Sequence, residues 1–554
     1  YMAFQVSPGV LVQEKDLTSI IPSLSTSIGG IVIASSKGQA NTIVEVSSEQ
    51  DLVNNFGIPD NTNASSWYTA ANFLKYSGAL KVVRAIDETA ALNASGSAGV
   101  LIDNDDIWEN SIPTAAGNFA ARSPGLWGNS LKVSVCPSAA AFTGWAHASL
   151  FDVAPGTSEY ASARGGANDE MYIVVSDEDG DITGTAGTIL ETFIVSKAYD
   201  AKSITGEGMY YKDKLFRSSE YIYWMDHETA SPAFGGAVKG VTYDATQVVY
   251  DLSLAGGLDG SYPTSGDFKE GLDLFDDPDT VDVNLLMCGP GDQVHAQNII
   301  NVCNSRKDCV GFISPLFADV VGVTSSATQT TNIKTYFDAL SSTSYAVFDS
   351  GWKYQYDTYN DVFRWVPLNG DVAGTCASTD NVSDPWFSPA GMSRGNIKSV
   401  VKLAFNPKKN ERDTLYKARI NPVVTFPGMG TLLWGDKTAQ AKASAFDRIN
   451  VRRLFITLEK AIAQASRAQL FEFNDDITRA NFLAMTNPYL RDVQGRRGIT
   501  DFKVVCDTSN NTGDVIDRNE FRADIYIKPA RSINFITLTF VATRTGVSFS
   551  EVGA

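Results

Sequence analysis

Cysteine and histidine are scarce in this sequence. Its 554 residues include six cysteines, none of them in a CxxC pair, and only three histidines. Because the early segment also lacks a secretory-signal pattern, the cysteines are expected to be reduced, buried thiols. The few histidines, at positions 147, 227 and 295, weaken any hydrolase scheme that needs one beside a serine or a cysteine. We predict no metal and no cofactor.

Positive charge is the second shortage. Lysine and arginine number 45 against 63 aspartate and glutamate residues, which gives a formal net charge of -18 at pH 7. Such a chain repels a phosphate backbone unless a basic face is segregated from the rest, so nucleic acid is not a predicted partner. Acidity of this kind indicates solubility at high local concentration.

Long hydrophobic runs are missing as well. The apolar run at residues 28–34 is far shorter than a membrane span requires, which predicts a soluble protein made in the cytoplasm, without direct membrane insertion. Apolar residues still make up 44% of the chain and charged residues 19%, the balance of a well-packed globular protein. Because the length exceeds one ordinary core, we expect about two to four domains.

The order of predicted elements indicates a multidomain protein of α/β and α+β class. Residues 1–24 alternate weakly around a Ser-Pro-Gly turn and are predicted to be an extended arm. Buried strands are expected at residues 28–34, 42–46 and 80–86, with helices opened by Ser48 and at residues 65–76. Strands and helices alternate again after residue 261, with a loop expected at residues 324–331. This pattern predicts one discontinuous α/β domain with a parallel sheet, built from residues 25–90 and 261–405.

Residues 91–260 interrupt that pattern. They are rich in Ala, Gly, Ser, Asn and Thr and lack a sustained helical period. The clearest element is a hairpin in which MYIVVS and TFIVS flank an Asp-rich turn at residues 177–184. We predict an inserted β-rich outer domain.

The C-terminal part, residues 406–530, is predicted to be an α+β domain. Its centre is a long helix at about residues 438–471, whose apolar residues recur at the spacing of one buried stripe. Arg448, Arg452 and Arg453 decorate this helix, either as a partner surface or as charges that are simply solvated. Strands follow at residues 501–507 and 520–527. Residues 531–554 are rich in β-branched and aromatic residues, and a last strand this apolar must pair with something.

Two motifs suggest chemistry and fail on their details. Residues 391–395 match the GxSxG nucleophile elbow around Ser393, but all three histidines precede the serine and a Pro-broken loop stands where a strand is needed. Asp177, Asp179 and Asp181 resemble the start of a calcium-binding EF-hand loop, yet Thr188 occupies the position of the bidentate glutamate. A loop and a solvated turn are the favoured interpretations, and no catalytic residue is predicted.

Several stretches resemble one known family. FDRINVRRLFITLEKAIAQASRAQLFEFND resembles the long helix of tail sheath proteins from contractile phages, and SPGVLVQEKDLT with STSIGGIVIASSKGQANTIVEVSSEQDLVNNFG resembles the opening of the same family. Between them, NLLMCGPG and VPLNGDVAGTCASTD are also similar to sheath sequences. The resemblance covers both ends closely and the α/β middle fairly well.

The resemblance implies a structural subunit, not an enzyme. Such subunits form a helical array of hexameric rings around an inner tail tube protein, with baseplate and tail terminator proteins as further partners, in the sheath of a virion assembled in the host cytoplasm. Contraction from a metastable extended state drives the tube through the host envelope. The C-terminal domain of such proteins faces the tube, which makes Arg448, Arg452 and Arg453 candidates for contact with an acidic tube surface.

The resemblance also implies that the two terminal arms, residues 1–24 and 531–554, add strands to sheets of neighbouring subunits, which is what unpartnered apolar strands would do. The candidate linking residues are Phe4, Val6, Val10, Val12, Ile533, Phe535, Ile536, Leu538 and Phe540. A sheath from a phage-derived injection or secretion system is an open alternative, and a serine hydrolase acting through Ser393 is a remote one.

Overall fold

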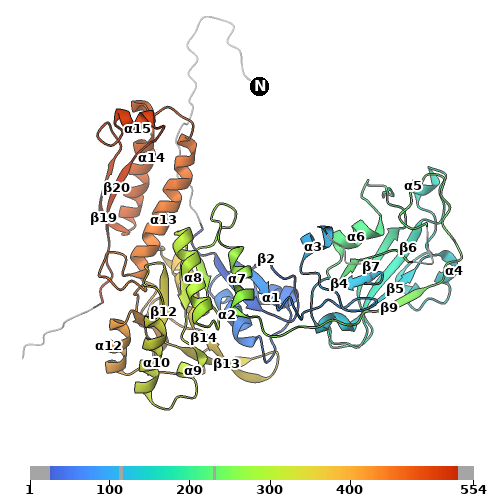
Figure 1. Cartoon of the computed structure of the whole chain (residues 1–554), viewed down its shortest axis with the longest axis horizontal. Coiled ribbons are helices and arrows are strands. Elements are labelled where there is room, and N and C mark those ends of the chain that lie inside the picture. Colours follow the sequence, from blue (N-terminus) through green and yellow to red (C-terminus); the bar gives the residue numbers. More distant parts are fainter. Residues whose placement is uncertain (1–24, 111–115, 229–232, 535–554) are drawn as a thin grey trace, which may run out of the picture. The chain divides into compact units, whose positions relative to one another are not determined.

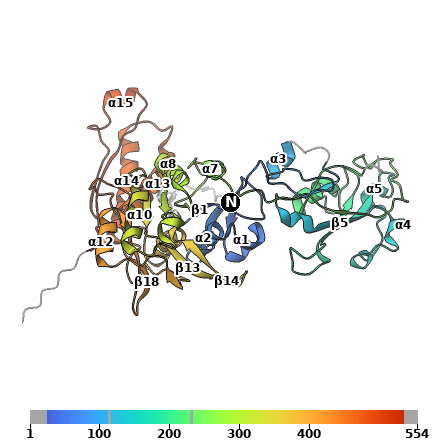
Figure 2. The same cartoon turned by 60° about the horizontal axis from the view of Figure 1, so that its bottom comes forward.

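The computed structural model describes residues 25–110, 116–228 and 233–534. These residues fall into two compact units. The larger unit contains Ser25–Pro385 and Pro389–Arg452, and the smaller unit contains Trp386–Ser388 and residues 453–534. Figures 1 and 2 show the elements of both units from two directions.

A seven-stranded sheet forms the centre of the larger unit. Its strand order is β16-β12-β11-β10-β1-β3-β2, and every pair is parallel except β2 with β3. Strands from both sides of the 91–260 segment thus meet in one sheet, and the predicted parallel sheet is confirmed as a mixed sheet that is mainly parallel. The strands are β1 (Gly29–Ala34), β2 (Ile43–Val46), β3 (Leu80–Ala85), β10 (Leu285–Met287), β11 (Val310–Ile313), β12 (Ala346–Asp349) and β16 (Ile420–Asn421).

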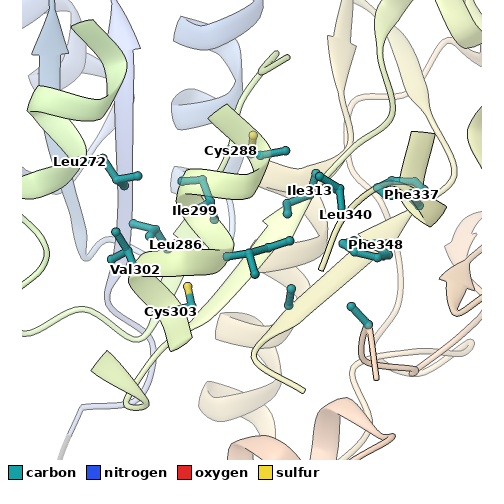
Figure 3. Close-up of a cluster of buried hydrophobic side chains, with 14 of the residues drawn as sticks. Leu272, Leu286, Cys288, Ile299, Val302, Cys303, Ile313, Phe337, Leu340 and Phe348 are labelled. Atoms are coloured by element: carbon teal, nitrogen blue, oxygen red, sulfur yellow. The ribbon is translucent and has the colours of Figure 1, made fainter. Parts of the chain in front are cut away.

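Helices cover both faces of this sheet. On one face, α2 (Ala64–Leu74) and α11 (Asn369–Val382) pack against each other and against the central strands. On the other face lie α7 (Ser265–Asp273), α8 (Gln293–Arg306) and α10 (Ser326–Asp338), whose apolar side chains form a hydrophobic core with the strands (Figure 3). Strands buried on both faces explain the continuous apolar runs in the sequence. Three shorter helices belong to the same unit: α9 (Phe317–Val320) and α12 (Lys409–Lys417) contact α10, and α1 (Glu49–Phe56) contacts α2 and β2.

Side-chain caps fix where these helices begin. Ser48 accepts from the Asp51 backbone at the start of α1, and Gly57, with φ of 75°, ends that helix as the sequence predicts. Ser325 caps α10 in the same way, accepting from Thr328. The helix therefore begins inside the predicted loop at residues 324–331. That prediction was wrong, because the Ser and Thr residues there include a helix cap and the first turn.

Residues 91–260 form their own sheets around their own core. The four-stranded sheet has the order β7-β6-β5-β9 and is antiparallel throughout, and β4 pairs with β8. The predicted hairpin is present as β6 and β7. The strands are β4 (Phe119–Ala121), β5 (Leu131–Cys136), β6 (Glu170–Asp177), β7 (Thr188–Ser196), β8 (Ile222–Trp224) and β9 (Tyr250–Ser253). The helices are α3 (Asp105–Asn110), α4 (Ala139–Phe142), α5 (Glu159–Ser162) and α6 (Tyr211–Ser218), with 3-10 turns η1 (Leu126–Ser130) and η2 (Ala148–Leu150).

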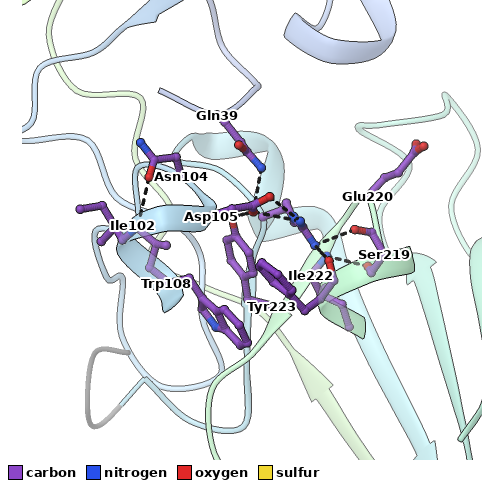
Figure 4. A network of polar contacts seen from close by, with 12 residues as sticks. Gln39, Ile102, Asn104, Asp105, Trp108, Ser219, Glu220, Ile222 and Tyr223 are labelled. Atoms are coloured by element: carbon purple, nitrogen blue, oxygen red, sulfur yellow. Dashed lines mark hydrogen bonds and ion pairs between the residues drawn. The ribbon is translucent and has the colours of Figure 1, made fainter. Parts of the chain in front are cut away.

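A polar network lies where this region meets the seven-stranded sheet (Figure 4). Asp105 accepts from Gln39 and from the Tyr223 hydroxyl, and its two carboxylate oxygens accept from Arg122 Nη2 at 2.9 and 3.0 Å. Nearby, the fully buried Arg84 at the end of β3 donates to the Ser35, Gly38 and Pro124 carbonyls. A buried guanidinium needs such partners, since leaving its donors unpaired is costly.

Two smaller sheets follow β12 in the larger unit. A three-stranded sheet has the order β14-β13-β15, from β13 (Trp352–Asp357), β14 (Val362–Pro367) and β15 (Lys402–Leu403), and Figure 2 shows β13 beside β14. The hairpin β17 (Val423–Phe426) and β18 (Gly430–Leu433) is separate. Residues 406–452 were assigned from sequence to the C-terminal domain. In the structure these residues lie in the larger unit, where β16 pairs with β12 and α12 packs against α10.

The smaller unit contains two long helices and a two-stranded sheet. Helix α13 (Ile449–Ser466) starts later and ends earlier than predicted, followed by a 3-10 turn η3 (Arg467–Gln469). Helix α14 (Asp476–Gly495) was not predicted at all. The antiparallel strands β19 (Ile499–Val505) and β20 (Asp524–Pro529), joined through α15 (Gly513–Asp517), confirm the two predicted strands. Leu454, Leu458, Phe482, Leu490 and Val493 lie in the core that unites these elements.

Candidate assembly surfaces

The GxSxG match does not form a nucleophile elbow. Ser393 is exposed in a turn, and in the described chain no helix begins between it and β15. The segment between α11 and Ser393 contains no strand either. The strand-turn-helix context that the motif requires is therefore missing at this place.

The usual ligand-binding edge of a parallel sheet is filled by the chain itself. In open α/β sheets ligands bind beyond the carboxyl ends of the strands, where the strand order reverses, which here is between β1 and β10. Asn369 at the start of α11 occupies this edge and is fully buried. Its side chain accepts from Gly289 at 3.2 Å and donates to the Gly289 carbonyl at 2.8 Å, and its backbone amide donates to Ser314 Oγ at 3.0 Å. The N-terminus of α11 thus lies beyond the carboxyl ends of β10 and β11.

The Asp-rich turn is organised by hydrogen bonds. Asp177 accepts from Ser130 Oγ at 2.5 Å, from the Thr183 backbone and hydroxyl at 2.7 Å each, and from Gly180 at 3.1 Å. Burial pushes the pKa of this carboxyl up, but the hydrogen bonds outweigh it and the pKa is lowered. Among residues 25–110, 116–228 and 233–534, no three His, Cys, Asp or Glu side chains gather closely enough to hold a metal ion.

All six cysteines are free and buried, as the sequence predicts. Burial raises the pKa of Cys288 to about 12 and that of Cys136 to about 11, so these thiols stay protonated at neutral pH and are poor nucleophiles. His295 is buried too, and burial lowers its pKa to about 4.

The three arginines proposed as tube contacts do not lie on an exposed helix face. Arg448 pairs with Asp436 at 3.0 Å. The Arg452 guanidinium lies 4.4 Å from the ring centroids of both Tyr345 and Phe446, with 4% of the residue exposed. Arg453 is equally buried. Arg452 and Arg453 are therefore not outer-face charges, because residues 449–454 at the start of α13 are buried, whereas Arg448 precedes the helix and is partly exposed.

The candidate linking residues of the arms lie mostly outside the described residues. This applies to Phe4, Val6, Val10, Val12, Phe535, Ile536, Leu538 and Phe540. Ile533 is described and is 83% exposed. Residues 525 and 527 of β20 pack on the core of the smaller unit, whereas Tyr526 and Lys528 between them are exposed. Within the described residues neither β19 nor β20 pairs with a third strand, so both outer edges of this sheet are open.

Sequence reasoning missed one exposed apolar segment in the smaller unit. It predicted that the long helix runs through Phe471, but α13 ends at Ser466 and Phe471 adopts φ of 70°. Between η3 and the first turn of α14, four large apolar side chains are 62–105% exposed: Leu470, Phe471, Phe473 and Ile477. No periodic signal marks them. No helix in the described part of the chain is both long and apolar enough to cross a bilayer.

Three family models match separate parts of the chain. The model of the Tail sheath protein Gp18 domain III N-terminal region matches residues 26–85, that of the Phage tail sheath protein central domain matches residues 274–439, and that of the Phage tail sheath C-terminal domain matches residues 441–543. The segment between residues 85 and 274 lies outside these matches.

Curated relatives match over the whole length. The chain is 34% identical to the Tail sheath protein of Vibrio phage KVP40 and 32% identical to that of Enterobacteria phage T4, with 99% of each chain covered in both comparisons. Solved structures share the fold. The sheath tail protein of Listeria innocua matches with a TM-score of 0.53 at 12% identity, over 92% of this chain and 96% of that one. The anti-feeding prophage helical sheath in the contracted state matches with a TM-score of 0.51 at 13% identity, over 98% of this chain and 100% of that one.

Proposed function

The chain belongs to the phage tail sheath family and is a subunit of a contractile sheath, and from this premise we propose how it assembles and works. Copies polymerise in stacked hexameric rings around an inner tube protein. They contract from a metastable extended state and drive the tube through the host envelope. The observation that carries this proposal is the match to tail sheath relatives over 99% of the chain.

The sheet of β19 and β20 is the proposed acceptor for the arms of neighbouring subunits. A two-stranded sheet is marginal alone, and exposed edges accept further strands through backbone hydrogen bonds. Both outer edges of this sheet are open within the described residues. Residues 1–24 and 531–554 supply the strands, through the linking residues identified from sequence. Inner and outer faces alternate along β20, so an added strand with the same alternation would extend the core beneath it.

Contraction needs no nucleotide in this scheme. At about 25 cal/mol per Å² of apolar area, each ~100 Å² of additional buried surface per subunit releases roughly 2.5 kcal/mol. Summed over the subunits of an array, this free energy drives a cooperative contraction. Arms that stay paired keep the array connected while the domains move as rigid bodies.

The finer division of the chain is part of the proposal. Residues 91–260 form the outer domain, residues 25–90 and 261–405 the α/β domain, and the C-terminal domain up to residue 530 faces the tube. The buried arginines at the start of α13 leave tube contact to other, exposed residues of that domain. Further partners are baseplate and tail terminator proteins, and nucleic acid and membranes are not partners. The protein acts in a virion assembled in host cytoplasm and catalyses no reaction.

A phage-derived injection or secretion particle is the second candidate. The fold shared with the anti-feeding prophage sheath supports this second candidate. Neighbouring genes decide between the two, because a capsid and packaging set beside this gene means a phage. Hydrolysis through Ser393 is not supported, since this serine lies in an exposed turn without the required elements. An esterase or protease signal that disappears on Ser393→Ala would reverse that conclusion.

Negative-stain microscopy and sedimentation of the purified protein test the function. Tubes or rings are expected, and a monodisperse monomer at high concentration would count against a sheath. Deleting Met2 to Asp16, or truncating before Ser532, should leave folded subunits that form no tubes. Leu538→Asp should act like the truncation, whereas Thr537→Asp, on the opposite face of an extended strand, should not. Normal tubes from either truncation would refute the arm assignment.

A further inference from the structure

The hairpin of β13 and β14 has its polar and apolar faces reversed. Directly opposed residues of an antiparallel pair share a face. On one face Tyr354 opposes Trp365 and Tyr356 opposes Phe363. On the other face Gln355 opposes Arg364 and Asp357 opposes Val362. A half-buried strand normally turns its apolar side inward. Here the polar side faces inward.

Hydrogen bonds and an ion pair attach the inward face to α2 and α11. Asn72 of α2 donates to Gln355 Oε1 at 2.9 Å, and the Tyr68 hydroxyl donates to Asp357 Oδ1 at 2.7 Å. Lys353 is fully buried and pairs with a carboxylate of α11. These contacts fix which side of the hairpin faces the body. The same contacts therefore hold the aromatic side of the hairpin outward.

The outward face is an aromatic surface that is exposed at Tyr356 and Phe363, whereas Trp365 is partly buried against the core and Trp352, on the same side of β13, is 4% exposed. The ring centroids of Tyr354 and Phe363 are 5.4 Å apart, those of Tyr354 and Trp365 are 4.7 Å apart, and those of Tyr356 and Phe363 are 5.2 Å apart. Tyr356 is 45% exposed and Phe363 is 49% exposed. Aromatic side chains exposed together on a rigid surface mark an interaction site. We call Tyr354, Tyr356, Phe363 and Trp365 the aromatic face.

Lys402 borders this face on the β15 side. Its Nζ lies 4.8 Å from the Tyr354 ring centroid and 5.5 Å from that of Trp365. The chain as a whole carries a formal charge of -18, so another copy has more carboxylates than cations to offer. An aromatic face with a cationic border is complementary to such a surface.

We propose that the aromatic face, together with Lys402, is an interface for an acidic surface of a second copy of this chain. The proposal rests on the proposed assembly into a sheath and adds a contact between subunit bodies to the contacts of the arms. An array in which subunits change neighbours on contraction needs surfaces of this kind besides its linking strands. Burial of these rings in the assembly would explain why the fold turns them outward in the subunit.

Oxidative footprinting of the wild-type protein tests the proposal without any substitution. Hydroxyl-radical modification of Tyr356 and Phe363 is measured in soluble subunits and in tubes formed by the purified chain alone. Several-fold protection in the tubes is expected. Equal modification in both samples overturns the proposal. Protection that appears only after the tube protein is added overturns it as well, because the occupant is then the tube protein.

Substitutions test the same face independently. Phe363→Asp should leave the unfolding midpoint of the subunit close to the wild-type value and raise the concentration needed for tubes at least about tenfold, the ratio that corresponds to ~1.4 kcal/mol. Thr358→Asp adds the same charge to the exposed hairpin turn and serves as the matched control, with unchanged tube formation. Lys402→Glu should weaken assembly most at low salt. Equal assembly of Phe363→Asp and Thr358→Asp contradicts the proposal. Wild-type protein that forms no tubes at all refutes the sheath assignment instead.

Discussion

Lys353 Nζ lies 2.8 Å from Asp371 Oδ2, and neither side chain has any solvent exposure. The pair joins β13 to α11, and the Tyr76 hydroxyl of the segment after α2 donates to the same carboxylate at 3.1 Å. Burial lowers the pKa of Lys353, and the neighbouring carboxylate opposes that shift. The ammonium and the carboxylate stabilise each other where water cannot.

Removing one member of this pair should therefore be severe. Lys353→Met leaves the Asp371 charge buried without its cation, which should lower the free energy of unfolding by about 3–5 kcal/mol in denaturant titrations of the subunit. Lys269→Met is the matched control, because its partner Asp273 is about half exposed and such a pair is worth roughly 0.5 kcal/mol. Similar losses in both variants would contradict the structural importance of the buried pair.

A second buried carboxyl predicts loss of stability as the pH rises toward about 8. Burial raises the pKa of Asp349 to about 8, although Ser314 donates to it at 2.6 Å and the Gly351 amide at 2.9 Å. Between the ordinary value of 3.8 and about 8, the unfolded chain has released a proton that the folded chain still holds. Stability from this group is thus full below the lower value and is lost as the pH rises to the upper one.

Asp349→Asn should remove this dependence. Between about pH 6.5 and about pH 8 the wild-type unfolding free energy should fall by up to ~1.4 kcal/mol per pH unit, and the variant should show a flatter profile. Denaturant midpoints measured from about pH 6.5 to about pH 8.5 check the slope. Parallel profiles of the two proteins would show that Asp349 is ionised in the fold.

His295 predicts the opposite dependence on the acid side. Its ring is buried beside Phe268 and its Nε2 lies 3.2 Å from the Cys288 carbonyl. Burial lowers its pKa from 6.5 to about 4. Below the unfolded value the unfolded chain gains a proton that the folded chain refuses, so stability is lost as the pH falls toward 4. Because Asp349 acts in the opposite direction over this range, the effect is best measured in Asp349→Asn. Adding His295→Gln should flatten the acid limb of the profile, and an unchanged limb would assign it to other groups.

The parallel sheet could be predicted from the sequence, because strands buried on both faces have unbroken apolar sequences, as at residues 80–86. Helix α11 could not. It is buried almost all round and built from small residues, so it has no amphipathic stripe to recognise. A Cβ on Gly370 would lie 2.4 Å from the Thr69 carbonyl oxygen, and one on Gly374 would lie 2.3 Å from the Tyr76 ring. The small residues exist for close packing on α2, a reason that the local sequence does not reveal.

The reversed hairpin escaped prediction for a related reason. The alternation at residues 352–357 has the normal period of a strand, but its polar members are satisfied by Tyr68 and Asn72, almost three hundred residues earlier. Helix α14 was missed because Pro488 lies inside it and its apolar residues are weakly periodic. The acceptor sheet of β19 and β20 was predicted from its strands, whereas its open edges became visible only with the topology.

Arg452 gives the sharpest test of where sequence reasoning about the assembly surface went wrong. A guanidinium between the rings of Tyr345 and Phe446, desolvated as this one is, should stabilise the fold through its cation–π contacts. Arg452→Ala should lower the unfolding free energy of the subunit by roughly 2–4 kcal/mol, measured by denaturant titration before any assembly. Arg491→Ala, at an exposed position of α14, is the matched control and should change it little. If Arg452→Ala leaves the subunit as stable as wild type and impairs only the binding of tube protein, the side chain serves a partner and the packing between the two rings is not its role.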